Sequence, residues 1–209
     1  MRRMDLDAQV RVADFDRWAS SRLVGDERLR GDLITLYAFE AELMAIPAKV
    51  SQPLLAQMRY TWWSDQLDGV FDGEPRKGHP VLERLSSVVR AHGVQREVLN
   101  ALIEAHIGRI QGQPHSLDAF FVGPMREAVR ILGGPGETAS TDVAGEVWGL
   151  TQTGRFDEAS RLRPEANRGL RGLPVRAFPA VAHAALRDPA APEALKRLRL
   201  AGAAFVGRV

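Results

Sequence analysis

The chain contains 209 residues, of which 45% are hydrophobic and 26% are charged, a composition typical of globular domains. Its formal net charge of +2 is too balanced to attract a polyanion, so nucleic acid is not expected as a partner. The complete lack of cysteine excludes disulfides, thiol catalysis and cysteine zinc sites. No run of about 18 apolar residues occurs, so no segment is expected to span a bilayer, and we expect a cytoplasmic protein.

Apolar residues recur at helical spacing along almost the whole chain, and no segment alternates apolar and polar residues as a strand does. The pattern predicts an all-α protein whose helices are separated by glycine, proline and capping residues. In chain order, the expected helices cover residues 10–23, 27–46, 52–72, 80–92, 95–111, 116–133, 140–153, 156–170 and 192–206.

The second expected helix carries a carboxylate on its apolar side. Glu40 falls in the middle of an arc formed by Leu29, Leu33, Leu36, Leu43 and Met44. A carboxylate in such a place must be paired, hydrogen-bonded, protonated or facing a wet cavity, because an isolated buried charge is costly. A structural salt bridge is the commoner outcome and a cavity lining is the functional alternative.

The third expected helix repeats this arrangement with Arg59 and Gln66, which lie near the centre of a wide apolar arc. That arc consists of Leu55, Met58, Trp62, Trp63, Leu67 and Val70. The short link between the two helices predicts antiparallel neighbours, and we therefore expect Glu40 and Arg59 to meet inside the bundle. Whether they form a register-fixing salt bridge or line a polar cavity stays open at this point.

Short motifs along the chain point to a family. They are Leu36-Tyr37-Ala38-Phe39, Val50-Ser51-Gln52-Pro53-Leu54-Leu55, Met58-Arg59, Trp62-Trp63, Gly78-His79-Pro80-Val81, Gly145, Leu150-Thr151, Arg155 and Leu173-Pro174-Val175-Arg176-Ala177-Phe178-Pro179-Ala180. In order and spacing, these motifs resemble the squalene and phytoene synthase superfamily. They are most similar to its branch of a mitochondrial complex I assembly factor.

The resemblance implies a single all-α helical-bundle domain of the isoprenoid synthase type, here truncated, over residues 9–207 after a tail at 1–8. Enzymes of this family condense two isoprenoid diphosphates head to head in a helical cavity. The resemblance also implies two Asp-rich motifs that hold Mg²⁺, which neutralises the diphosphate leaving group.

In this sequence the resemblance places other residues at those acidic positions. The Asp positions of the first motif fall on Met44, Ala45 and Ala48, none of which can bind Mg²⁺. The leading position of the second motif falls on Phe156. The lid segment that usually follows is expected to be largely missing between 160 and 170.

Two residue sets follow from these patterns. The candidate cavity-lining residues are Glu40, Met44, Arg59, Trp63, Gln66 and Phe156. The candidates for a degenerate second motif are Arg155, Asp157 and Glu158. No catalytic or metal-binding residue is expected, and the five histidines, which lack metal-ligand spacing, are expected at the surface or as caps.

The resemblance implies a non-catalytic assembly or accessory factor, with respiratory complex I as the implied client. Its partners would be membrane-complex subunits or assembly machinery. One alternative is a prenyltransferase, for which alone Mg²⁺ would be a cofactor. Another is a prenyl- or lipid-binding protein without turnover. The basic segment 195–205 fits a peripheral contact with the inner membrane or, more commonly, a solvated helix.

Overall fold

The computed structural model describes residues 5–50, 52–136 and 139–209, and within these ranges all regular secondary structure is helical. The first part of the chain forms α1 (Leu6–Ala13), α2 (Phe15–Ser21), α3 (Glu27–Met44), α4 (Ile46–Lys49), α5 (Pro53–Asp72), α6 (Pro80–His92) and α7 (Arg96–Ile110). The second part forms a π-helical turn η1 (Asp118–Val122), α8 (Gly123–Ile131), α9 (Ala139–Gln152), α10 (Phe156–Gly169), three 3₁₀ segments η2 (Leu170–Gly172), η3 (Val175–Ala180) and η4 (Ala182–Ala185), and α11 (Glu193–Val206). The all-α prediction is confirmed.

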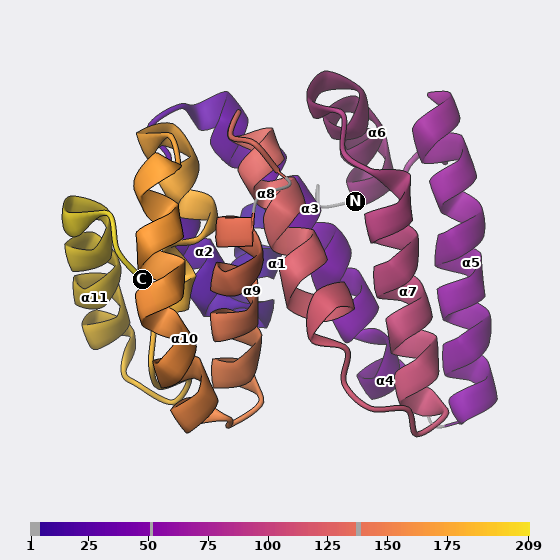
Figure 1. Ribbon diagram of the computed structural model, residues 1–209. Coiled ribbons are helices and arrows are strands. Elements are labelled where there is room, and N and C mark those ends of the chain that lie inside the picture. The colour runs from indigo at the N-terminus through magenta and orange to yellow at the C-terminus, as the bar shows by residue number, and fades with distance from the viewer. Residues whose placement is uncertain (1–4, 51, 137–138) are drawn as a thin grey trace.

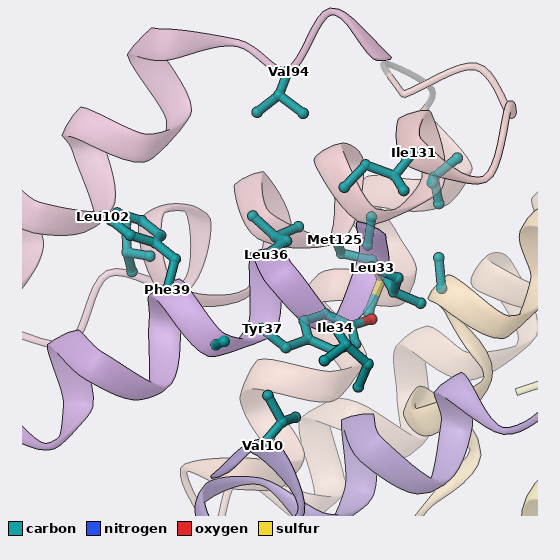
Figure 2. Close-up of a cluster of buried hydrophobic side chains, with 14 of the residues drawn as sticks. Val10, Leu33, Ile34, Leu36, Tyr37, Phe39, Val94, Leu102, Met125 and Ile131 are labelled. Carbon is teal, nitrogen blue, oxygen red and sulfur yellow. The ribbon is translucent and has the colours of Figure 1, made fainter. Parts of the chain in front are cut away.

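Helix α3 forms the centre of the core. It packs against α1, α2, α6 and α8, and every residue from 33 to 41 is buried. In Figure 1, α5, α6 and α7 stand on one side of α3, and α9, α10 and α11 stand on the other. Figure 2 shows Leu33, Leu36 and Phe39 of α3 among apolar side chains from other helices. Each fully buried Leu or Phe side chain stabilises the fold by about 1.5–3 kcal/mol.

The segment expected as one helix over 10–23 is two helices. Asp14 interrupts it with a non-helical backbone (φ −147°, ψ 85°), and its side chain accepts a hydrogen bond from the backbone N–H of Arg17 at 2.9 Å, which caps α2. Helix α1 starts at Leu6, inside the segment 1–8 that the sequence assigns to a tail. After the break, the side chains of Asp16 and Arg17 are buried.

After residue 170, where the expected helix 156–170 ends and the sequence predicts no further element before 192, the chain forms three 3₁₀ segments that reach residue 185. Residues 177–184 are buried, and Ser20 of α2 donates a hydrogen bond to the carbonyl of Pro179 at 2.5 Å. His183 lies in this segment and is buried against Trp148, so its expected place at the surface is wrong. None of the described helices is long and apolar enough to cross a membrane.

Candidate functional site

A cavity of about 640 Å³ opens between α2, α3, α7, η1, α9 and the start of α11. It lies next to the break between α1 and α2. Its lining consists of Ala13, Asp14, Phe15, Asp16, Arg17, Glu40, Met44, Leu102, His106, His115, Phe120, Phe121, Trp148, Gln152, Thr153, Pro189 and Lys196. We call it the central cavity.

A buried ion pair forms part of its floor. Glu40 is only 4% exposed and accepts a hydrogen bond from Nη1 of Arg17, whose Nε lies 3.3 Å from Oδ2 of Asp14. Burial raises the pKa of Glu40, and the Arg17 charge opposes that shift. Burial alone would lower the pKa of Arg17, but Glu40 and Asp14 together hold it above its usual value. Arg17 therefore stays charged and balances part of the negative charge of the two carboxylates beside it.

The expected pairing of Glu40 with Arg59 is wrong. The buried face of α5 follows Ala56, Tyr60, Trp63, Leu67 and Val70. Arg59 lies off this face and is exposed. The sequence arc was misplaced because Leu55 and Met58, which helped to define it, are 43% and 61% exposed. The two helices do touch, since the Tyr60 hydroxyl donates to the carbonyl of Leu43 at 3.1 Å.

A second ion pair joins α2 to α11 across the central cavity. Nζ of Lys196 lies 2.7 Å from Oδ1 of Asp16 and donates a hydrogen bond to the carbonyl of Pro189 at 2.6 Å. Both charged side chains are buried. Burial raises the pKa of Asp16, against the opposing effect of Lys196. Lys196, which the sequence places in a basic surface pattern, is thus an interior residue.

Aromatic side chains form the opposite wall. Phe120 and Phe121 come from η1, which packs against α9. The close approach requires Gly149, because a Cβ atom at that position would lie 2.6 Å from Cδ2 of Phe121 and 2.9 Å from Cδ2 of Leu117. Such distances force a shift of the neighbouring groups. This wall gives the cavity a large apolar surface.

Two histidines belong to the lining of the central cavity. His106 stacks on Tyr60 with ring centroids 5.2 Å apart, and His115 lies against Phe120 at 4.3 Å. Burial, reinforced by the positive charges of His115 and Arg109, lowers the pKa of His106 to about 4. Histidine spacing gave no signal for either residue. The apolar face of segment 95–111 is the feature that could have placed His106 inside.

Two buried polar atoms of the lining have neither a hydrogen bond nor an ion-pair contact among the described residues, whereas Oδ1 of Asp16 lacks a hydrogen bond but lies 2.7 Å from Nζ of Lys196. The two atoms are Oε1 of Glu40 and Nε1 of Trp148. One is an acceptor and the other is a donor, so the cavity wall presents both kinds of unused hydrogen-bonding group. Buried polar groups of this kind favour a ligand or a water molecule that satisfies them.

The structure separates the expected cavity residues. Glu40 and Met44 line the central cavity. Arg59 and Trp63 instead line a smaller pocket of about 280 Å³, together with Glu42. These four expected cavity-lining residues are therefore divided between two different pockets.

The remaining expected residues line neither of these two pockets. Gln66 is half-buried on α5, and Phe156 is largely exposed at the start of α10. Arg155 and Glu158 form a surface ion pair at 2.6 Å beside the exposed Asp157. Phe156 and the three candidates for the second motif therefore lie on the outer surface.

The donor set of the central cavity does not fit a Mg²⁺–diphosphate centre. Mg²⁺ prefers carboxylate oxygens in octahedral geometry, yet Asp14, Asp16 and Glu40 are each engaged by Arg17 or Lys196. Within the described ranges, no group of three or more His, Asp or Glu side chains is arranged to hold a metal ion.

Comparison with known proteins gives one match. A family model described as squalene/phytoene synthase matches residues 10–120, more than half of the chain. The matched segment runs from α1 into η1 and includes Arg17, Glu40 and Met44. No curated protein and no solved structure matches the chain. On the evidence of the family model, the chain belongs to the squalene/phytoene synthase family.

Proposed function

We propose that this family member does not cleave isoprenoid diphosphates and instead holds a neutral prenyl or lipid chain in its central cavity, acting as an accessory factor. The main support for this proposal is that the charged side chains of the cavity are already paired. Arg17 contacts Glu40 and Asp14, and Lys196 contacts Asp16. Carboxylates held this way would have to leave their cations to bind Mg²⁺. Breaking a buried pair costs about 3–5 kcal/mol.

The apolar wall supports a hydrocarbon ligand. The volume of about 640 Å³ lies in the range of small-molecule sites, and apolar burial contributes about 25 cal/mol per Å². A hydroxyl at the end of a prenyl chain could donate to Oε1 of Glu40 and accept from Nε1 of Trp148, the two buried atoms without partners among the described residues. A diphosphate, by contrast, would meet three carboxylates against two cations, and both cations already contact those carboxylates.

The first test separates binding from turnover. The protein is incubated with farnesyl or geranylgeranyl diphosphate and Mg²⁺, and released diphosphate is measured against a protein-free control. We expect no release above that control. Clear turnover would establish the prenyltransferase alternative and overturn the proposal.

The second test measures the ligand class. Farnesol should change the tryptophan fluorescence of the protein, and the Trp148→Phe variant should lose most of that change while Trp62→Phe, on α5, keeps it. Farnesyl diphosphate should bind at least about tenfold more weakly than farnesol, because its charge meets the cavity carboxylates. Tighter binding of the diphosphate would contradict a neutral ligand.

The accessory role has its own support and its own test. Leu54, Leu55 and Met58 expose apolar surface on α5, and such patches favour protein partners. By the resemblance, we propose subunits of a membrane complex such as respiratory complex I, or its assembly machinery, reached at the inner membrane surface. Affinity purification should enrich those subunits, and a Leu54→Ser, Met58→Gln double variant should lose them. Recovery of the protein alone with a bound isoprenoid diphosphate would contradict this role.

A further inference from the structure

A second cavity, of about 490 Å³, lies between α10 and the last residues of the chain. It shares no lining residue with the central cavity. Its lining consists of Ser160, Arg163, Pro164, Asn167, Arg168, Arg171, Arg187, Arg208 and Val209. Five of these nine residues are arginines, and none has an acidic side chain. We call it the arginine pocket; in Figure 1, α10 and the end of the chain that form it lie side by side.

Helical spacing gathers these charges. Ser160, Arg163, Asn167 and Arg171 follow one another at three- or four-residue steps and so share one face of α10 and the turn after it. The end of the chain is fixed to the same face. The backbone N–H of Val209 donates to Oδ1 of Asn167 at 2.7 Å, and Nδ2 of Asn167 donates to the carbonyl of Val209 at 2.9 Å.

Arg163 forms the base of the pocket and is only 6% exposed. Its Nη1 donates to the carbonyl of Ala184 at 2.6 Å and its Nη2 donates to the carbonyl of Leu186 at 3.2 Å. Nε is buried and has no hydrogen-bond partner within the described part of the chain. Burial and the charges of Arg187 and Arg199 lower the pKa of Arg163 to about 10. The side chain is therefore still charged at neutral pH and lacks a full set of partners.

The charges of the pocket arginines are not balanced by acidic side chains. Several other arginines do pair with acids, as Arg155 does with Glu158 and Arg197 does with Glu193. Across the described residues, none of the five pocket arginines has a carboxylate of Asp or Glu within salt-bridge distance. Several like charges around one concave surface repel one another, and an anion of high charge relieves that repulsion.

We propose that the arginine pocket binds a phosphate monoester, either as a soluble small molecule or as the headgroup of a phosphatidic acid lipid. A guanidinium presents a planar fork of donors that matches two phosphate oxygens, and such charge-assisted bonds are strong. The dianionic charge of a monoester suits a site with five cations. The volume of about 490 Å³ leaves room for the group that carries the phosphate.

Titration calorimetry of the full chain with sn-glycerol 3-phosphate tests the soluble form. The Arg168→Gln, Arg187→Gln double variant removes two exposed pocket cations and should weaken binding by about tenfold or more, since each lost charge-assisted bond is a substantial share of the affinity. Arg163 is left in place because it holds the carbonyls of Ala184 and Leu186. Thermal midpoints of the variants verify folding.

The matched control removes two exposed arginines that do not line the pocket, in an Arg84→Gln, Arg161→Gln double variant. Arg161 lies on the same helix, α10, so the control changes the net charge equally and nearby. We expect less than about a twofold change in affinity, as bulk charge at moderate salt is largely screened. Equal weakening by both double variants would show nonspecific attraction and overturn the proposal.

A vesicle arm identifies the source of the phosphate. Vesicles of phosphatidylcholine alone are compared with vesicles that also contain phosphatidic acid. Binding of glycerol 3-phosphate without vesicle binding supports a soluble ligand, whereas binding to phosphatidic acid vesicles that is lost in the Arg168→Gln, Arg187→Gln variant supports the headgroup. Failure of both probes to bind overturns the proposal. The central-cavity proposal is untouched by either result, because the two sites share no residue.

Discussion

Glu40 depends on Arg17 for its charge balance, and this dependence can be measured. Arg17→Met should cost about 3–5 kcal/mol in the free energy of unfolding, because it leaves a buried carboxylate without its cation. Adding Glu40→Leu should recover much of that loss. Urea denaturation of the full double-mutant cycle gives the coupling energy.

Arg59 supplies the control for this cycle. It is exposed, so Arg59→Met should change the unfolding free energy little and should combine additively with Glu40→Leu. Coupling of Glu40 to Arg59 rather than to Arg17 would contradict the observed pairing.

His106 should make the protein sensitive to acid. Its pKa is about 4 in the folded chain, against about 6.5 for an unfolded histidine. Between those values the unfolded state binds more protons, so stability is full above pH about 6.5 and falls as the pH drops toward 4. Unfolding measured across this window should show a shallower decline for His106→Phe. Identical slopes in the two proteins would show that His106 does not carry this effect.

At the scale of elements, local signals predicted much of the fold. The expected helix over 80–92 coincides with α6, because Pro80 at its start and Gly93 at its end act through their own backbone. The 3₁₀ segment η3 could not be predicted in this way. It is stabilised by distant contacts such as the bond from Ser20 to the carbonyl of Pro179.

The candidate site shows the same division. Periodicity placed Glu40 inside, since burial of one helix face is a local pattern. The contact of Glu40 with Arg17 and the contact of Asp16 with Lys196 each join residues that are far apart in sequence. Residue spacing within a single helix carries no information on those contacts. Arg59 was predicted instead because apolar residues of α5 that are in fact exposed were assigned to its buried face.

Alanine should have opposite effects at two helical glycines, because only one of them lies in a close contact between elements. Gly149→Ala should destabilise the protein by about 1–3 kcal/mol, because the new Cβ meets Phe121. Gly202→Ala in α11 meets nothing within 4 Å and should stabilise by up to about 1 kcal/mol through helix propensity. Thermal or urea unfolding of both variants measures the difference. Stabilisation by Gly149→Ala would show that η1 can move away freely.

At the scale of the whole molecule, the small net charge conceals an uneven distribution. Residues 155–209 contain 11 of the 28 Lys and Arg residues but only 5 of the 26 acids. The excess positive charge therefore lies in the C-terminal part, beyond the segment 10–120 that matches the family model. Both the arginine pocket and α11 belong to this part. The small net charge gave no reason to expect a polyanion bound over the whole surface. A net charge carries no information on where the positive side chains gather.

Helix α11 should be held in place by Lys196. Lys196→Met removes the cation that pairs with Asp16, so backbone amides of α11 should exchange faster with deuterated water. Glu193→Gln, on the same helix, changes only an exposed pair with Arg197 and should leave exchange nearly unchanged. Equal protection in Lys196→Met and the original protein would show that the other contacts of α11 suffice.

The position of Lys196 also has a kinetic consequence. Its side chain lines the central cavity, and the helix that carries it, α11, packs against both η4 and α2. We therefore expect lifting of α11 to open the central cavity, so that ligand exchange becomes faster when that helix is held less firmly. Weakening the Asp16–Lys196 contact should therefore raise both the dissociation and the association rate, because the ligand enters and leaves through the same opening.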